Sequence, residues 1–308
     1  MDSQDERLDV RVVFAFAAVY IIWGSTYLGI YFAILTWPPM ILGAARFIIM
    51  GVLMYSYIHF VKKERLDLPL FRFGLISGFL MFFIGNGAVI LAEKQLPSGL
   101  VSIIAGTVPF WLLLLDKRSG AARFRNMLTW LGLILGFAGV ILLFTGRLES
   151  VRMDSGMIWS YLILIVGTLG WTTGTLYSKY HEVKGSVLAK VSVQVLCAGF
   201  LFLLAAWIKG EFRGFSLSQV SDTSWIALWY LIFFGSMIGY FCYMWLLNRV
   251  SPHAVGTYAY VNPVVAVILG NVLAGEILSS REFIALFLIT GGLLILYLSK
   301  KPWAPRFR

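Results

Sequence analysis

Long apolar runs, each about the length needed to cross a bilayer, most constrain what this chain can fold into. Ten such runs follow one another, separated by short polar clusters: residues 12–37, 39–61, 71–92, 97–115, 126–145, 156–180, 186–208, 223–247, 252–275 and 282–299. A hydrocarbon core of about 30 Å needs about 20 apolar residues in a helix, whereas barrel strands are about ten residues of alternating polarity. The runs therefore predict an all-α integral membrane protein with ten transmembrane helices.

The composition excludes a water-soluble protein. Hydrophobic residues make up 59% of the chain and charged residues 13%, against about 25% charged residues in soluble domains. The first run is too long, and its flank too acidic, for a cleaved signal peptide. The net charge of +10 lies in clusters between apolar runs, which is typical of membrane topology and not of a nucleic-acid-binding face. We expect no nucleic-acid partner.

The distribution of Lys and Arg predicts the orientation. With the N-terminus inside, 18 of these residues fall in inner segments and 6 in outer ones, while Arg46 lies within a helix. Positive charge accumulates on the cytoplasmic side. We therefore expect a multi-pass protein of the cell (inner) membrane with both termini cytoplasmic and the lipid bilayer as its partner. The oligomeric state stays open, and a monomer is possible.

An internal repeat organises the runs. The segment 85–109 recurs in plan at 239–263, a shift of 154 positions, with glycine opening and proline closing each copy. Further matches in the same order pair Trp23 with Trp171 and Gly139 with Gly292. Five helices are an odd number, so the second copy enters the membrane inverted. The predicted units are a cytoplasmic segment 1–11, repeat one at 12–147, repeat two at 156–300 and a cytoplasmic basic tail 301–308.

Inverted repeats around a central cavity are the architecture of many secondary transporters. The alternative is an old duplication kept only for packing. Small residues at GxxxG spacing would let helices approach closely, although with 30 glycines some pairs arise by chance. The pairs are Gly74/Gly78, Gly132/Gly136, Gly170/Gly174 and Gly235/Gly239.

Four motifs carry a family resemblance: WGSTYL at 23–28, PPMILGAARF at 38–47, GNGAVILAEKQLPSGL at 85–100 and VNP at 261–263. Together they resemble the EamA-type branch of the drug/metabolite transporter superfamily, and within it the YedA-like and PecM-like bacterial exporters. The resemblance covers nearly the whole chain. It implies ten helices in two inverted EamA repeats, a central cavity and alternating access. Family members move amino acids, sugars, nucleotide sugars and other metabolites.

The residues favour transport over catalysis. The sequence has no HExxH, GxSxG or P-loop motif and no metal-ligand spacing, so we expect no enzyme activity, cofactor or metal. We expect a secondary transporter that exports a small metabolite such as an amino acid or a related zwitterionic or aromatic compound. The alternatives are an importer or exchanger of a sugar or nucleotide sugar, and an intramembrane enzyme or scaffold. No carboxylate lies in mid-membrane, which weakens a proton-coupled mechanism.

Three charged residues are candidates for the site or its gate. Arg46 is the only basic residue deep within a predicted span, where it would bind a substrate carboxylate or phosphate, or instead pin a neighbouring helix. Glu93 and Lys94 lie together at the outer end of the third helix. They would form an ion-paired gate, or simply a solvated helix end.

The polar and aromatic candidates fall on the first, third, fourth, sixth, eighth and ninth helices, which we expect to line the site. Helix breaks before Pro109 and Pro263 would free carbonyl groups beside it. The mates Trp23 and Trp171 would face each other, and Asn86 and Tyr240 would supply polar contacts, unless these residues serve packing alone. The full set is Trp23, Thr26, Asn86, Thr107, Trp171, Thr175, Tyr177, Tyr240, Tyr243, Tyr258 and Asn262.

Overall fold

The computed structural model describes residues 10–64, 66–119, 126–145, 155–277 and 279–298, which form helices joined by loops, with no strand among them. In chain order the helices are α1 (Val10–Ile34), α2 (Pro39–Ser56), η1 (Tyr57–Lys62), α3 (Leu68–Gly78), η2 (Phe79–Asn86), α4 (Gly87–Ala92), α5 (Ser98–Ala105), α6 (Val108–Leu115), η3 (Lys117–Ser119), α7 (Met127–Thr145), α8 (Ser155–Tyr180), α9 (Val187–Ile208), η5 (Leu217–Gln219), α10 (Asp222–Tyr230), η6 (Leu231–Ile238), α11 (Gly239–Arg249), α12 (Pro252–Val255), α13 (Tyr258–Ala274) and α14 (Ser280–Leu298). The predicted all-helical class is confirmed for these residues.

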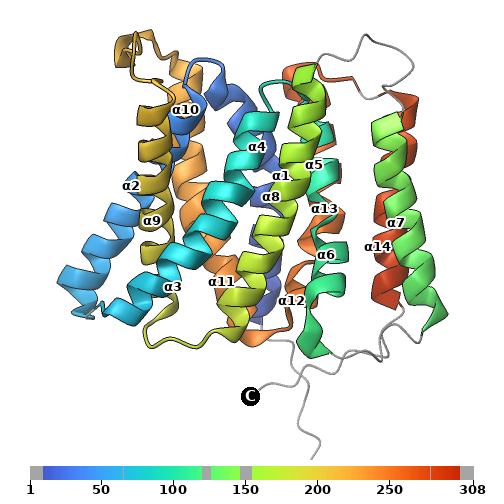
Figure 1. Ribbon diagram of the computed structural model, residues 1–308, viewed down its shortest axis with the longest axis horizontal. Helices are drawn as coiled ribbons and strands as arrows, with labels where there is room; N and C mark the ends of the chain where they lie inside the picture. The colour runs from blue at the N-terminus through green and yellow to red at the C-terminus, as the bar shows by residue number, and fades with distance from the viewer. Residues whose placement is uncertain (1–9, 65, 120–125, 146–154, 278, 299–308) are drawn as a thin grey trace, which may run out of the picture.

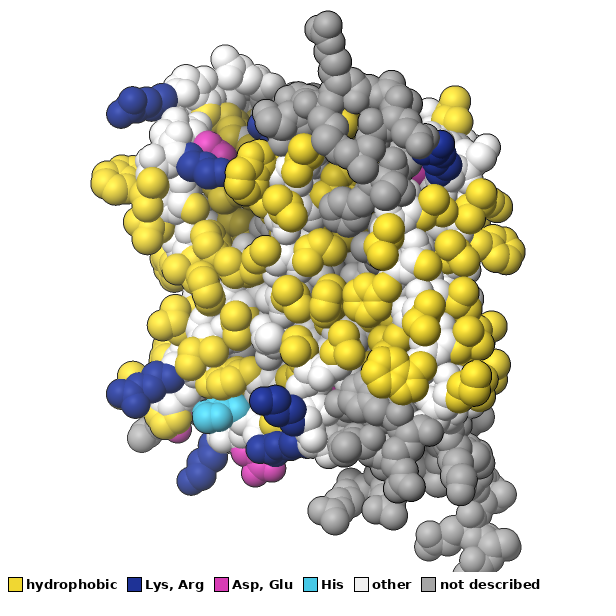
Figure 2. Space-filling model, turned by 45° about the vertical axis from the view of Figure 1, so that its right-hand side comes forward, with side chains coloured by type: hydrophobic (Ala, Val, Ile, Leu, Met, Phe, Trp, Pro, Cys, Tyr) yellow, Lys and Arg dark blue, Asp and Glu magenta, His cyan; other side chains and the backbone are white. Residues whose placement is uncertain are grey.

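The predicted apolar runs fall on these helices, with ends that differ by no more than about one turn. Seven helical segments are long and apolar enough to cross a membrane, and Met127–Gly139 and Val261–Ala274 are shorter apolar stretches within α7 and α13. Figure 2 shows hydrophobic side chains over the middle of the visible face, with charged side chains near its upper and lower ends. This arrangement fits a protein surrounded by lipid, while the number of ten crossings stays a prediction.

Polar residues fix where the helices begin. The Asp67 carboxylate accepts a hydrogen bond from the backbone N–H of Leu70 at 3.0 Å at the start of α3. The Ser186 hydroxyl accepts one from Ala189 at 3.1 Å at the start of α9. Such caps satisfy backbone donors that lack a partner within the helix, so each helix begins close to the edge of its polar loop.

The helices form one bundle with two distinct ends (Figure 1). We call the end where α1 begins and α14 finishes the terminal side. The loops before α3 and α9 meet there, where Glu64 accepts a hydrogen bond from the backbone of Ser186 at 2.6 Å. At the opposite side, the Glu211 carboxylate accepts hydrogen bonds from Met40 N at 2.9 Å and Ile41 N at 3.1 Å. Each contact joins the first half of the chain to the second.

The four glycine pairs at GxxxG spacing all lie against other helices. Gly74 and Gly78 face Val193 and Gln194, Gly132 and Gly136 face Gly292 and Phe110, Gly170 and Gly174 face Ile84 and Met81, and Gly235 and Gly239 face Thr26 and Trp23. A Cβ atom on Gly78 would lie 2.3 Å from the Gln194 carbonyl oxygen. The absent side chains therefore allow backbone-to-backbone approach, as expected from the spacing.

One of the two predicted helix breaks lies elsewhere. The break between α5 and α6 precedes Pro109 as predicted, but α13 runs through Pro263 without interruption. In both halves the break falls at a Gly-Thr pair, residues 106–107 and 256–257, because glycine is a poor helix former. The two halves meet here: a Cβ atom on Gly106 would lie 3.2 Å from Pro263 Cγ and 3.4 Å from the Ala259 carbonyl oxygen.

Candidate substrate-binding site

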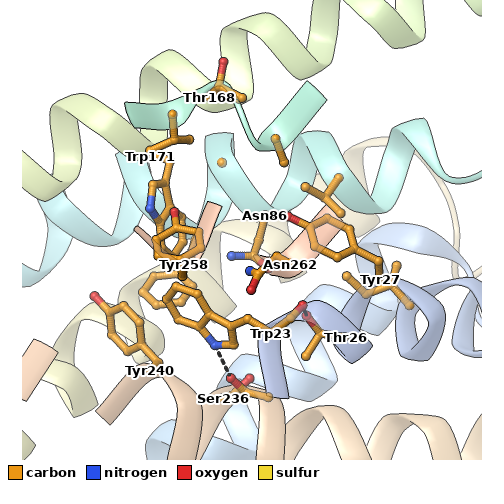
Figure 3. Close-up of a pocket in the computed structure, with 18 of the residues that line it drawn as sticks. Trp23, Thr26, Tyr27, Asn86, Thr168, Trp171, Ser236, Tyr240, Tyr258 and Asn262 are labelled. Carbon is orange, nitrogen blue, oxygen red and sulfur yellow. Dashed lines mark hydrogen bonds between the residues drawn. The ribbon is translucent and has the colours of Figure 1, made fainter. Parts of the chain in front are cut away.

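A cavity lies between elements of both halves of the chain, and Figure 3 shows residues that line it. Its volume is about 90 Å³. Its walls come from α1, η2, α4, α5, α6, α8, η6, α11 and α13, which are parts of the helices predicted to line the site, and α2 adds Arg46. The predicted residues on its wall are Trp23, Thr26, Arg46, Asn86, Trp171, Tyr240, Tyr258 and Asn262.

Three polar residues that were not predicted from the sequence also line the cavity: Tyr27, Thr168 and Ser236. Each lies about one helical turn from a selected residue, since Tyr27 follows Trp23 by four positions and Thr168 precedes Trp171 by three. Residues three or four apart share a helix face. This spacing was the signal available in the sequence.

Aromatic rings from both halves meet around Trp23 and form a floor to the cavity. The Trp23 ring centroid lies 5.4 Å from that of Trp171, 4.9 Å from Tyr243 and 5.2 Å from Tyr258. The repeat mates Trp23 and Trp171 therefore face each other, edge to face at 82°. The Trp23 indole N–H donates to the Gly235 carbonyl oxygen at 3.0 Å (Figure 3). These contacts give the cavity an apolar, shape-specific base.

Two π-helical segments occupy matching places in the two halves. Shifting η2 by the repeat distance of 154 positions gives 233–240, which overlaps η6 at Leu231–Ile238. Both segments contribute to the cavity wall, through Gly85 and Asn86 in one half and Gly235 and Ser236 in the other. π-Helical turns are rare, and they concentrate at functional sites.

Arg46 is the positively charged residue of the cavity wall. It is 4% exposed, and its Nε donates to the Ser236 hydroxyl at 2.7 Å. Its Nη1 has no hydrogen-bond partner among the described residues. Arg46 therefore pins α2 to η6, and its Nη1 lies at the cavity wall without a partner among the described residues.

The two asparagine residues of the wall differ in their bonding. The Asn86 amide makes no hydrogen bond within the described part of the chain, and Figure 3 shows it pointing into the cavity. The amide orientation of Asn262 that suits its neighbours has its Nδ2 donating to the carbonyl oxygens of Tyr20 at 3.0 Å and Tyr258 at 3.1 Å. Asn262 thus joins α13 to α1, whereas the Asn86 amide lines the cavity without a partner among the described residues.

The hydroxyl group of Tyr240 does not serve the cavity, contrary to our expectation of a polar contact from it. It donates to Gln194 Oε1 at 2.9 Å, and Gln194 Nε2 donates to the hydroxyls of Ser77 at 2.9 Å and Ser178 at 3.1 Å. Only the ring of Tyr240 faces the cavity, where it packs edge to face against Phe82 with ring centroids 4.5 Å apart. A buried polar group requires a partner, and the fully buried Gln194 provides it.

Hydrogen bonds below the aromatic floor lie on the terminal side; those of Thr175 and Lys179 stay within the second half of the chain, whereas those of Tyr180 join it to the first half. The hydroxyls of Thr175 and Tyr243 are 2.7 Å apart. Tyr180 donates to both carboxylate oxygens of Asp116, at 3.0 and 3.1 Å. The Lys179 ammonium group donates to the carbonyl oxygens of Leu247 and Val250 at 2.5 and 3.2 Å. The cavity therefore extends from the floor toward the opposite side.

The remaining predicted residues lie outside the cavity wall. The Thr107 hydroxyl donates to the Ile104 carbonyl oxygen at 2.7 Å at the α5–α6 break. Tyr177 stacks on His181 near the terminal end of α8, with ring centroids 4.8 Å apart. Glu93 is buried and Lys94 is exposed, so these neighbours face different environments and form no ion pair with each other.

Comparison with known proteins gives a family. The model of the EamA-like transporter family matches residues 10–145 and 158–298. The chain is 35% identical over 290 residues to a relative described as the uncharacterized inner membrane transporter YedA of Escherichia coli (strain K12), covering 93% of this chain and 90% of that protein. It is 25% identical over 284 residues to a "Probable amino-acid metabolite efflux pump" of Salmonella typhimurium, covering 90% and 91%. A solved crystal structure at 18% identity shares the fold, with a TM-score of 0.66 over 93% of this chain and 96% of that one. The chain belongs to the EamA-like transporter family.

Proposed function

We propose that this protein is a secondary transporter of the inner membrane that works by alternating access and exports a small metabolite bearing a carboxylate, such as an amino acid. The observation that carries the proposal is Arg46, a buried arginine on the cavity wall whose Nη1 has no partner among the described residues. Guanidinium groups bind carboxylates strongly in dry surroundings. The Asn86 amide adds a neutral polar contact.

The shape and the lining of the cavity support the same substrate class. The aromatic floor around Trp23 suits an apolar side chain. A nucleotide sugar fits the lining less well, because its phosphates would require more than one cationic side chain and Arg46 is the cationic side chain among the lining residues. One relative is named as an amino-acid metabolite efflux pump, which supports both the substrate class and the outward direction.

Alternating access is supported by the composition of the walls. Both halves of the chain contribute to the cavity, and inverted halves that rock around a fixed site can expose it to each side in turn. The hydrogen bonds from Tyr180 to Asp116 join the two halves on the terminal side. Opening that side between the halves requires these two hydrogen bonds to break. The Lys and Arg distribution supports a cytoplasmic location for this side.

The test uses the purified protein in liposomes with the proteinogenic L-amino acids, their methyl esters, and a panel of sugars and nucleotide sugars. We expect one or more amino acids to be bound and moved, and their methyl esters, which lack the carboxylate, to be ignored. Arg46→Gln should weaken binding by about 100-fold or more, the effect of losing a buried charged contact of 3 kcal/mol or more. Arg249→Gln is the matched control. The Arg249 guanidinium lies over the Trp245 ring, with Cζ 3.7 Å from the ring centroid, and it does not line the cavity. Transport of sugars with no response to amino acids would refute the proposal.

A further inference from the structure

Glu93 is a buried carboxyl group without hydrogen-bond partners. It follows the last residue of α4, is 4% exposed, and neither of its carboxylate oxygens accepts a hydrogen bond from the described residues. Its neighbour Lys94 points to the surface. An ionised carboxylate in such surroundings loses its hydration and gains no hydrogen bond to replace it. The neutral form is therefore favoured unless a cation lies close.

The charged and titratable groups that face Glu93 come from three elements. Arg46 on α2, Tyr27 on α1 and Glu276 after α13 lie within electrostatic range of its carboxyl group. Arg46 and Tyr27 line the cavity. Glu93 thus lies beside the proposed substrate site while remaining outside its wall.

The side chain of Glu276 accepts three hydrogen bonds at the start of α5. Its Oε1 accepts from Ser98 N at 2.8 Å, and its Oε2 accepts from the Ser98 hydroxyl at 2.9 Å and from Gly99 N at 3.1 Å. These donors stabilise a negative charge at a helix N-terminus. A second negative charge on Glu93 would be repelled by it, whereas the cation of Arg46 would attract that charge.

Arg46 is therefore shared between two anions that compete for it. Its Nη1 and both carboxylate oxygens of Glu93 are buried and have no hydrogen-bond partner among the described residues, and the two charged groups lie within electrostatic range of each other. We propose that Glu93 is a proton-binding site linked to the substrate site: when neutral it leaves the charge of Arg46 to the substrate carboxylate, and when ionised it takes that charge for itself. The proton binds to a carboxyl oxygen of Glu93 and returns to water on ionisation. This inference rests on the proposed function of Arg46.

The linkage has a definite sign. Where Glu93 is neutral, the dissociation constant of an anionic substrate is independent of pH. Above the pH at which Glu93 ionises, substrate binding must also return one proton to Glu93, so the dissociation constant rises by about tenfold per pH unit.

Two measurements test this between about pH 5 and pH 9, the range that spans ordinary carboxyl and imidazole titration and beyond. Infrared difference spectra of the protein in lipid nanodiscs follow the carbonyl band of a protonated carboxyl group, which Glu93→Gln should abolish. Binding of the best amino acid from the panel is measured over the same range. Glu211→Gln is the matched control, since that carboxylate lies on the same side but accepts backbone hydrogen bonds from Met40 and Ile41.

We expect the wild-type carbonyl band to disappear over the pH range in which affinity begins to fall. Glu93→Gln should give a pH-independent dissociation constant, and Glu211→Gln should behave as wild type. Arg46→Gln should move the loss of the band to higher pH without any substrate, because the cation that favours ionisation is gone. If Glu93→Gln fails to fold, Glu93→Asp replaces it and should shift the band.

The outcomes separate this inference from the proposed function. Amino-acid binding with a dissociation constant that stays flat across the loss of the band overturns the role of Glu93 and leaves the substrate proposal intact. If no amino acid binds, the proposed substrate is wrong, and the infrared results with Arg46→Gln decide the coupling alone. Absence of a band that depends on Glu93, or a band unmoved by Arg46→Gln, overturns the inference. Binding that requires Na⁺ and ignores pH assigns the carboxylate to a metal cation and overturns it as well.

Discussion

Replacing Tyr240 by phenylalanine separates a structural role from a binding role at one atom. The substitution removes the hydroxyl that donates to Gln194 at 2.9 Å and keeps the ring that packs on Phe82 and Trp23. Gln194 Oε1 then loses the hydrogen bond from Tyr240 in a fully buried position. A buried side-chain hydrogen bond within a membrane protein contributes on average about 0.6 kcal/mol and at most about 1.7 kcal/mol. We expect Tyr240→Phe to lower the free energy of unfolding by about 0.6–1.7 kcal/mol.

Substrate affinity should respond differently. Since the hydroxyl points to Gln194 and only the ring faces the cavity, the dissociation constant of the transported amino acid should change by less than about twofold, or about 0.4 kcal/mol. Asn86→Ala is the counterpart, because the Asn86 amide has no partner within the described residues. It should weaken binding by about 5- to 150-fold, corresponding to 1–3 kcal/mol, and leave stability nearly unchanged.

Both quantities can be measured on the same purified samples. Stability is read from denaturant-induced unfolding in mixed micelles, and affinity from scintillation proximity binding of the radiolabelled amino acid. The reasoning would be refuted if Tyr240→Phe weakened binding by tenfold or more at unchanged stability. In that case the hydroxyl would contact the substrate during transport, and its bond to Gln194 would be a feature of the empty site alone.

Two further predictions address packing and topology. Gly78→Ala should destabilise the protein by about 1–3 kcal/mol in the same unfolding assay, because its Cβ would lie 2.3 Å from the Gln194 carbonyl oxygen. Gly291→Ala, with nothing within 4 Å of its Cβ, should be neutral or slightly stabilising. Equal effects of the two substitutions would contradict the close approach of Gly78 to α9. In a variant without native cysteines, a cysteine at Glu182 should react with an impermeant maleimide only from the cytoplasmic side, and one at Ser218 only from outside; reversed labelling in oriented membranes would contradict the predicted orientation.

Helix positions could be predicted from the sequence because a lipid environment allows few backbone conformations. A segment inside a bilayer must satisfy its own backbone, so an apolar run of about 20 residues becomes a helix whatever its neighbours. The runs ending at Ala92 and Leu115 illustrate this, since the helices of the structure finish at the same residues. The pairing of Trp23 with Trp171 followed from the repeat and is realised as a ring contact.

The orientation of single side chains was not accessible in this way. Tyr240 and Asn86 are repeat mates, yet their polar groups differ in surroundings. The Tyr240 hydroxyl donates to Gln194 on α9, whereas the Asn86 amide lines the cavity. The difference depends on which residue of another helix stands opposite each, and helix periodicity carries no such information. The same holds for Pro263, where a proline that predicts a break lies within a continuous helix.

The sequence by itself determined the membrane-spanning class, the helix positions and the duplicated plan, because these follow from hydrophobic length and from local backbone chemistry. Only the tertiary structure decided which polar groups are satisfied by neighbours and which are not. Arg46 Nη1, the Asn86 amide and the Glu93 carboxyl group belong to the second set, because the helices packed around them supply too few hydrogen-bond partners among the described residues. Hydrogen-bond satisfaction is a property of three-dimensional contacts, and it distinguishes a binding residue from a packing residue of the same type.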